Sequence, residues 1–271
     1  MRAGLAALSL LLIAPPDASA QDDSFLRGSL GSPSRWDGVH FGVQLGRSNM
    51  NTDFGNSTSA LVAFSLRNTA VQQEFAPSNW TTLPSTTTNG QQYGAFIGYN
   101  IQWDALVVGF DVAYNRMSSL ETTSSDSIAR QVTTSDTFVN QVNIVASSSL
   151  KLVDYATIRA RAGYAFGQFL PYAVLGGAVG RFNYMTTATT TVSGNSPTIL
   201  PPNNVYGPIT DTQSSGKDNA ITGGFVAGLG VDVALMPNVF LRAEWEFVGF
   251  APVGGIRASI NSGHVGIGMK F

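Results

Sequence analysis

The sequence predicts an all-β fold, namely an eight-stranded antiparallel up-and-down transmembrane β-barrel with short periplasmic turns and long extracellular loops. Three observations predict it. Segments of about ten residues alternate apolar side chains with small or polar ones, as the strands of membrane barrels do. Long and short connections between these segments alternate along the chain. The chain ends on a large aromatic residue, Phe271.

The last eight residues, His264 to Phe271, show the alternation clearly. Val265, Ile267 and Met269 fall with Phe271 on one side of an extended strand, because successive side chains point to opposite faces. A strand at the end of the chain leaves an unpaired polar edge unless another strand covers it. Pairing with the first strand of the same sheet covers this edge and closes a barrel.

Composition favours a barrel whose outer face does not meet water. Charged residues make up 12% of the chain and hydrophobic residues 44%, whereas an ordinary soluble domain carries roughly 25% charged residues. The 29 glycines suit strands that pack closely or bend. A net charge of -2 argues against a nucleic-acid partner. The chain has no cysteine, which excludes disulfides, thiol catalysis and cysteine-ligated zinc.

The N-terminus has the features of a secretory signal peptide. Arg2 precedes an apolar run over residues 5–14, and Ala18-Ser19-Ala20 supplies small residues for cleavage. The run is shorter than the about 20 residues that a spanning helix needs. We therefore expect a signal peptide over residues 1–20, cleaved at the site that Ala18 and Ala20 mark. A periplasmic lead-in over residues 21–36 and the barrel over residues 37–271 would follow.

Eight segments alternate with the period of a strand. They are residues 39–46, 93–102, 106–115, 156–164, 170–182, 224–233, 239–247 and 264–271. Residues expected to face lipid include Phe110, Leu229, Leu241 and Val265. In the fifth segment we expect Leu170, Tyr172, Val174, Ala178 and Phe182 outward, with Ala173, Gly177, Val179 and Arg181 inward.

The connections alternate in length. Long segments rich in Ser, Thr and Asn cover residues 48–90, 117–149 and 185–218, and a shorter connection covers residues 251–259. Tight turns at Trp103-Asp104 and at Met236-Pro237-Asn238 lie on the other side. Short turns on one side, long loops on the other and an even number of strands are typical of barrels in the outer membrane of Gram-negative bacteria.

The polar face of each strand indicates which face is inside. A soluble lipocalin-type barrel has the same period with its apolar face inward. Here the polar face is mostly Gly, Ala, Asn and Gln with few charges, as a narrow interior requires, whereas a face in water tolerates rows of Lys and Glu. Aromatic residues near the strand ends fit interfacial girdles, with an ordinary core as the alternative. They are Tyr93, Tyr99, Trp103, Tyr114, Tyr164, Tyr172, Phe182, Tyr184, Trp245 and Phe250.

Three segments carry a family resemblance: residues 94–100 (GAFIGYN), residues 223–230 (GGFVAGLG) and the ending at residues 265–271 (VGIGMKF). They resemble the small, porin-like outer-membrane barrels of alphaproteobacteria that are called outer-membrane immunogenic or surface-antigen proteins. The resemblance covers residues 36–271 apart from the loops. It implies an envelope and surface role, and it implies that the assembly machinery of the outer membrane recognises Phe271.

Charged side chains on the expected inner face predict a structural network that fills the lumen, because charges removed from water persist only when they are paired. The members of this expected network are Asp111, Arg159, Arg161, Arg181, Asp232, Arg242, Glu244, Glu246 and Lys270.

Candidate catalytic and metal-binding residues are few. His40 and His264 are the only histidines, and barrel closure would make their strands neighbours, so they fit either a polar network of the lumen or a metal or acid/base pair. Glu244 and Glu246 lie two apart on one face, but Arg242 shares that face and favours an ion-pair network. No nucleophile elbow, phosphate loop or EF-hand pattern occurs. The sequence therefore predicts no enzyme, no cofactor and no metal.

Three functions remain open from the sequence. The favoured one is a non-catalytic surface protein that contributes to envelope structure and presents extracellular loops. The first alternative is a small porin for solutes, although eight strands leave an interior that side chains fill. The second is a surface protein that binds a haem-type or host molecule with its loops. Expected partners are the outer-membrane lipid and the assembly machinery, with an unidentified loop ligand as the open case.

Overall fold

The computed structural model describes residues 35–81 and 83–271. The chain divides into two units, Met1–Pro33 and Ser34–Phe271, and the described residues all belong to the second. The expected signal peptide, its cleavage site at Ala18 and Ala20, and the lead-in up to residue 34 lie outside the described residues.

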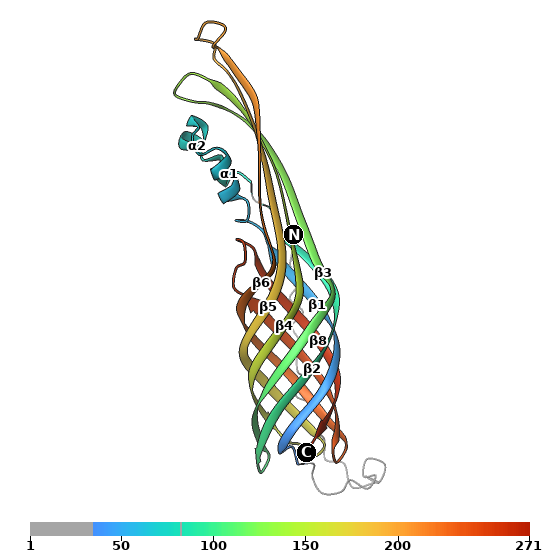
Figure 1. Cartoon of the computed structure of the whole chain (residues 1–271). Helices are drawn as coiled ribbons and strands as arrows, with labels where there is room; N and C mark the ends of the chain where they lie inside the picture. Colours follow the sequence, from blue (N-terminus) through green and yellow to red (C-terminus); the bar gives the residue numbers. More distant parts are fainter. Residues whose placement is uncertain (1–34, 82) are drawn as a thin grey trace, which may run out of the picture. The chain divides into compact units, whose positions relative to one another are not determined.

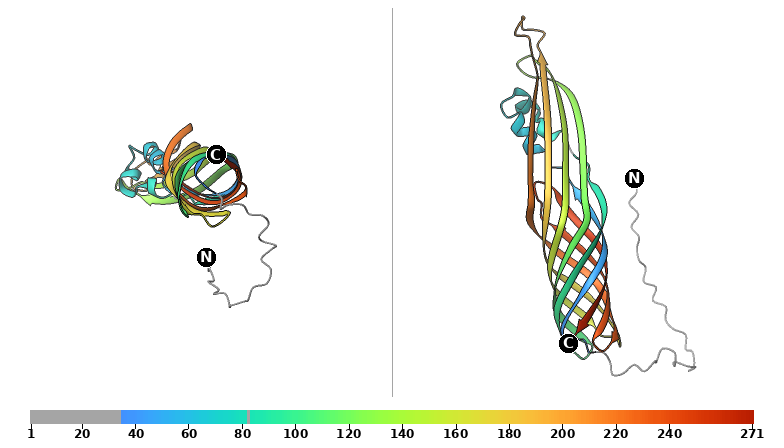
Figure 2. Two further views of the ribbon diagram at one scale, coloured as in Figure 1. Left: turned by 90° about the horizontal axis from the view of Figure 1, so that it is seen from below. Right: turned by 45° about the vertical axis from the view of Figure 1, so that its right-hand side comes forward.

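Eight strands form a closed barrel in chain order. They are β1 (Gly38–Asp53), β2 (Thr86–Trp103), β3 (Leu106–Thr133), β4 (Val139–Tyr164), β5 (Phe169–Asn195), β6 (Val205–Met236), β7 (Val239–Phe250) and β8 (Arg257–Lys270). Each pairs antiparallel with the next, and β1 closes the ring on β8 from His40↔Lys270 to Asp53↔Arg257. Figure 1 shows the barrel from the side, and the left view of Figure 2 shows it from below. The predicted fold class is confirmed.

Four strands continue far beyond the ring. The segments expected as loops over residues 117–149 and 185–218 are mostly strand, so those loop boundaries are wrong. We call the extension the blade: residues 120–133 of β3, 139–152 of β4, 184–195 of β5 and 205–217 of β6, all hydrogen-bonded in register. At about 3.4 Å per residue, the paired stretch from Leu120 to Thr133 is roughly 45 Å long. Figures 1 and 2 show the blade rising above the barrel at the end opposite the C-terminus.

Register shifts mark the boundary between barrel and blade. They fall between Arg116 and Leu120, between Leu152 and Asp154, and between Phe182 and Tyr184. An extra residue in one strand moves the residues beyond it to the opposite face, because the side-chain period is two. In β4 the buried residues are odd-numbered in the barrel, as at Arg159, and even-numbered in the blade, as at Ile144.

The connection between β1 and β2 contains α1 (Ser59–Ser65), α2 (Ala70–Phe75) and the 3-10 helix η1 (Pro77–Asn79). The Thr69 side chain caps α2 by accepting a hydrogen bond from the Gln72 backbone N–H at 3.2 Å. Ala76 adopts a left-handed conformation and ends the helix. Both helices lie beside the blade (Figure 1). No helix of the described residues combines the length and apolar character that crossing a membrane requires.

The outward face of the barrel is apolar, as expected. Phe110, Leu229, Leu241 and Val265 all point outward and are 43–64% exposed. The assignment of β5 is wrong: Leu170, Tyr172, Val174, Ala178 and Phe182 point inward and are buried, whereas Val179 is exposed on the outside. Both faces of β5 carry apolar residues, so alternation alone does not orient this strand.

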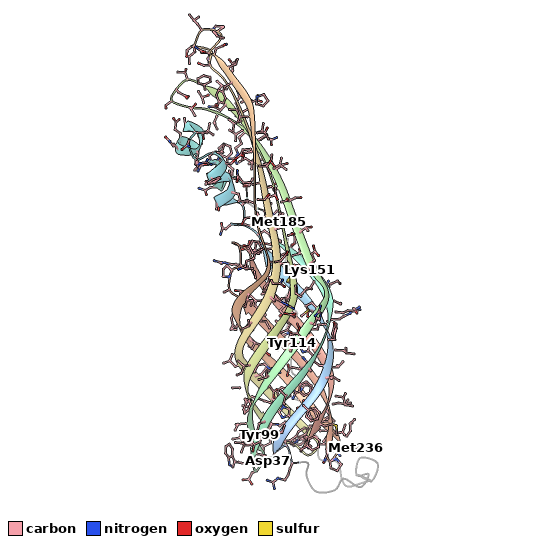
Figure 3. The ribbon with its side chains drawn as sticks, in the orientation of Figure 1. Asp37, Tyr99, Tyr114, Lys151, Met185 and Met236 are labelled. Atoms are coloured by element: carbon pink, nitrogen blue, oxygen red, sulfur yellow. The ribbon has the colours of Figure 1, made fainter. Side chains whose placement is uncertain are left out.

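The aromatic residues divide between the two faces of the barrel wall. Tyr93, Tyr99, Trp103, Tyr114, Tyr164 and Trp245 are exposed outward, as expected for interfacial girdles. Tyr172, Phe182 and Phe250 were expected there as well, but they are buried inside the barrel. Their rings fill the interior, and the girdle is correspondingly smaller. Figure 3 labels Tyr99 near the turn end of the barrel and Tyr114 nearer the blade.

Candidate functional site

Seven buried charged residues meet inside the barrel: Asp111, Arg159, Arg161, Asp232, Arg242, Glu244 and Glu246. They come from the inward positions of β3, β4, β6 and β7. We call them the ion network. The three arginines and four carboxylates are almost completely buried, so water does not solvate their charges and each charge must be compensated by its neighbours.

The distances link the ion network into one cluster. The Arg159 Nη1 atom lies 2.5 Å from Glu244 Oε1 and 2.7 Å from Glu246 Oε2. Arg161 Nη2 lies 2.5 Å from Asp232 Oδ2, and Arg242 Nε donates to Asp232 Oδ1 at 3.0 Å. Asp111 joins both halves, because its Oδ2 accepts from Arg242 Nη1 at 3.3 Å and from Arg159 Nη2 at 3.5 Å.

Two tyrosines complete the ion network. The Tyr155 hydroxyl donates to Glu246 Oε1 at 2.8 Å, and the Tyr172 hydroxyl donates to Glu244 Oε2 at 2.7 Å. The Arg161 guanidinium lies over the Tyr172 ring, 3.6 Å from its centroid. Sequence reasoning missed both residues. Tyr172 was assigned to the wrong face of β5, and Tyr155 lies one position outside the segment expected as the fourth strand.

Two expected members lie outside the ion network. Arg181 faces outward and pairs with Asp154 at the boundary between barrel and blade, with 39% of its side chain exposed. The error follows from the inverted face of β5. Lys270 does point inward, but its Nζ donates to the Arg35 carbonyl oxygen at 2.6 Å and lies 4.1 Å from the centroid of the Trp36 ring. It closes the turn end of the barrel instead of pairing with a carboxylate.

The two histidines contact different partners. His40 Nε2 lies 2.7 Å from Asp111 Oδ1 and therefore borders the ion network. His264 Nδ1 lies 3.2 Å from Gln44 Nε2, and its Nε2 contacts the Gln92 side-chain amide. Among the described residues there is no group of three or more His, Cys, Asp and Glu side chains that could hold a metal ion. Both histidines contact polar side chains of the barrel interior, at different places.

Apolar layers lie on both sides of the ion network. The lower layer, at the turn end, consists of Trp36, Phe96, Val107, Ala113, Leu170, Ala234 and Phe240. Trp36, the last residue of the expected lead-in, is buried in this layer. Its backbone N–H donates to Gln102 Oε1 at 2.7 Å, and its ring packs edge-on against Phe240. The upper layer, at the base of the blade, includes Phe54, Leu120, Leu152, Phe182, Val248, Phe250 and Ile260.

The two faces of the blade differ in chemistry. The face continuous with the barrel interior carries apolar residues together with buried hydroxyl residues such as Thr190. Val62, Leu66 and Val71 of the helical connection pack on its apolar part, against Val142, Ile144, Ala188 and Val192. The Ser65 hydroxyl lies 2.6 Å from Thr190 Oγ1 and donates to Asp211 Oδ2 at 2.6 Å. Outside, cross-strand hydroxyl pairs such as Thr189 with Thr212 at 2.9 Å form a ladder. The blade thus has one covered face and one exposed hydroxyl face.

The chain matches the family described as outer membrane protein beta-barrel domain over residues 3–271. It is therefore an outer-membrane β-barrel protein, and it belongs to this family. Its location is the outer membrane. No curated protein sequence is significantly similar to it.

Solved structures of other outer-membrane proteins are similar to the chain. Ail, the attachment invasion locus protein of Yersinia pestis, is 10% identical with a TM-score of 0.34, and the match covers 87% of this chain and 100% of Ail. OprG of Pseudomonas aeruginosa is 11% identical with a TM-score of 0.35, covering 89% of this chain and 99% of OprG. Neisserial surface protein A is 13% identical with a TM-score of 0.33, and the match covers 85% of this chain and 97% of that protein.

Proposed function

We propose that the protein is a non-conducting, non-catalytic anchor that holds the blade upright on the bacterial surface. One observation carries the proposal: the barrel interior is filled by the ion network between two apolar layers. An interior of eight strands has room for side chains only, and here large aromatic and charged side chains occupy it. The porin alternative needs an open path that this packing does not offer.

The outward apolar band fits a membrane-spanning role. On β2 it extends from Tyr93 to Trp103, both exposed. Ten steps of about 3.4 Å along a strand tilted by about 40° rise roughly 26 Å, close to the about 25 Å apolar band of such barrels. Polar residues begin directly above it, at Arg47 on β1 and Gln91 on β2. The blade then lies entirely on the extracellular side.

Conductance tests the proposal. We expect the refolded full chain to give no steady current in planar bilayers. As a control, a variant in which short turns replace residues 123–149 and 187–214 removes most of the blade at the register pairs Thr123↔Ser149 and Thr187↔Ser214. This variant is expected to keep heat-modifiable gel migration and to remain non-conducting. Long-lived channels in correctly folded wild-type protein would contradict the proposal.

Phe271 supports a further part of the proposal, recognition by the assembly machinery of the outer membrane. Its backbone N–H donates to the Val39 carbonyl oxygen at 2.9 Å, and its ring stacks on Phe41 with centroids 5.8 Å apart. The ring is nevertheless 65% exposed, so a partner can reach it. Phe271→Ala is expected to lower the amount of assembled barrel in the membrane, whereas Phe41→Ala is expected to leave recognition intact.

Surface ligand binding is the second candidate function, and the hydroxyl face of the blade favours it. Ladders of Thr and Ser side chains from β5 and β6 are exposed there, including Thr187 with Ser214 and Thr191 with Thr210. Hydroxyl rows offer many neutral donors and acceptors to a polar partner. Saturable binding of a host-surface molecule that the variant without the blade loses would support this role. The resemblance to alphaproteobacterial surface antigens belongs to the same proposal.

A further inference from the structure

A polar recess of about 690 Å³ lies on the outer wall, directly above the apolar band. Its lining comes from β1, β2, β3 and β8: Arg47, Ser48, Asn49, Asn89, Gly90, Gln91, Ser118, Ser119 and Asn261. We call it the headgroup recess. Strand pairing brings its parts together, because Arg47 is the register partner of Gln91 and Asn49 is the register partner of both Asn89 and Asn261.

The lining combines one guanidinium with side-chain amides and hydroxyls, and it contains no carboxylate. Asn49 Nδ2 donates to Asn89 Oδ1 at 2.9 Å, which fixes these two amides side by side. Arg47 is exposed and makes no hydrogen bond or ion pair with any residue that the structure describes. A Cβ added at Gly263, the other register partner of Arg47, would meet nothing within 4 Å, so the outer face of the wall is open beside Gly263.

The position of the headgroup recess is set by the apolar residues below it. Leu45, Tyr93 and Val265 are register neighbours, and each is 51–64% exposed on the outward face. They lie two residues below Arg47, Gln91 and Gly263 on the same strands, which is roughly 7 Å along the chain. Arg116, the register partner of Tyr93, adds a second cation at the same edge. A lipid whose acyl chains contact this band would place its headgroup in the recess.

A second recess, lined by residues of β3, β4, β5 and β6, has the reverse charge. It has a volume of about 240 Å³ and is lined by Glu121, Ser149, Lys151, Asn183, Tyr184, Met185 and Asp218. The Lys151 Nζ atom lies 3.6 Å from Glu121 Oε2, and Asp218 also lines the recess, so the lining holds two carboxylates and one ammonium. Figure 3 labels Lys151 and Met185 at the base of the blade. An anionic group is repelled here, whereas the headgroup recess attracts it.

We propose that the headgroup recess binds the phosphorylated saccharide headgroup of a glycolipid of the outer leaflet. The phosphate is held by Arg47, whose planar guanidinium fits phosphate oxygens bidentately. Asn49, Asn89 and Gln91 hydrogen-bond the sugar hydroxyls. The acyl chains run down over Leu45, Tyr93 and Val265. The lipid thus fixes one side of the barrel at the membrane surface, below the blade.

Native mass spectrometry of the detergent-solubilised, refolded full chain tests this. The probes are a lipid whose glucosamine disaccharide headgroup carries phosphate, the same lipid without phosphate, and inorganic phosphate alone. We expect the phosphorylated lipid to bind at least about tenfold more tightly than the dephosphorylated lipid, which corresponds to about 1.4 kcal/mol. Inorganic phosphate at millimolar concentration is expected not to displace it.

Variants of matched charge locate the binding site. Arg47→Ala is expected to weaken binding of the phosphorylated lipid about tenfold, and Arg47→Lys to keep part of the affinity because the charge remains. Lys151→Ala removes one positive charge from the second recess and is expected to leave lipid binding unchanged. Heat-modifiable migration verifies that each variant is folded.

Three outcomes would overturn the inference. The first is equal affinity for the lipid with and without phosphate. The second is equal affinity of Arg47→Ala and wild type. The third is displacement of the lipid by inorganic phosphate, which would make the recess a site for free anions.

Discussion

Four of the eight strands of the barrel continue into the blade, and along β4 the chemistry of the two faces changes between barrel and blade. In the barrel part of β4, Ile158 faces outward to lipid and Arg159 faces the interior. In the blade part of the same strand, Ser147 faces outward to water and Ile144 is buried under the helical connection. The comparison teaches that the surrounding medium, and not the strand, decides which face is apolar.

The bulges make this inversion compatible with one continuous strand. In β3, β4 and β6 the inward set moves by one residue at the height where the outside changes from lipid to water, whereas β5 keeps its even-numbered residues inward throughout. In β6, Asn219 adopts a positive φ of 54° within this irregular stretch, and its N–H donates to Asn183 Oδ1 at 2.8 Å. Asn tolerates the left-handed region better than most residues, which suits it to this position.

The largest effect is expected from the charged interior of the barrel. Arg159→Ala leaves Glu244 and Glu246 without their common partner, in a cluster that then has two arginines for four carboxylates. Breaking a buried pair in this way costs about 3 to 5 kcal/mol. We expect the free energy of unfolding, measured by urea titration in lipid vesicles, to fall by that amount.

Arg181→Ala is the control for this variant. Its pair with Asp154 lies at the boundary with the blade, where the arginine side chain is 39% exposed and the aspartate side chain 9% exposed. After the substitution the Tyr114 hydroxyl still donates to Asp154 at 3.0 Å, so we expect a smaller loss than for Arg159→Ala. If Arg159→Ala and Arg181→Ala lowered the free energy of unfolding equally, the prediction that the interior ion pairs matter more for stability would be contradicted.

The next largest effect is expected from the outward faces. Ile158→Arg and Ser147→Arg place the same charge at outward positions of β4, one in the barrel and one in the blade. In lipid an arginine near the midplane costs about 2 to 4 kcal/mol, whereas a surface substitution in water stays within about 0.5 kcal/mol. Reversible unfolding in vesicles measures both. A similar loss of stability at the two positions would contradict a boundary between lipid and water along β4.

The barrel was largely predictable from the sequence because the lipid-facing side of each spanning strand is apolar. Alternation identified all eight strands and the inward positions of Arg159, Arg242, Glu244 and Glu246. It did not orient β5, whose two faces are both apolar. Inside the barrel, Leu170 and Phe182 join the apolar layers and Tyr172 joins the ion network.

The blade was not predictable in the same way. Most of its outward residues are Ser, Thr and Asn, which are common in loops, and the bulges interrupt the period where the strands leave the membrane. Its apolar residues, such as Val142 and Ile144, form only a short alternation, and they are buried because the helical connection covers them. Contacts between segments distant in sequence, such as Ser65 with Asp211, leave no local signal.

A smaller effect is expected where the helical connection covers the blade. Val62→Ala removes two methyl groups from the buried face of α1, where Val62 is fully buried, and should cost about 1.5 to 2 kcal/mol of local docking free energy. Phe64→Ala, on the same helix, changes a side chain that is 52% exposed and should cost little. Hydrogen exchange of the α1 amides measures both. Faster exchange after Phe64→Ala alone would contradict the packing of α1.

The smallest effect is a pH dependence confined to the blade. Hydrogen bonds from Ser65 and then Gln213 hold the pKa of Asp211 below its ordinary value, with a further contribution from the charge of Arg67. A carboxyl group whose pKa is lower in the folded state stabilises that state above the pKa of an unfolded aspartate, about 3.9, and the stabilisation is lost as pH falls through the folded value. The contact between α1 and the blade should therefore be constant from pH 6 to 8 and weaken only in acid.

Asp211→Asn should remove this dependence. The ratio of α1 exchange rates in wild type and Asp211→Asn, taken at each pH so that the intrinsic chemistry cancels, is the measurement. A ratio that changes between pH 6 and 8 would show that another group controls the contact.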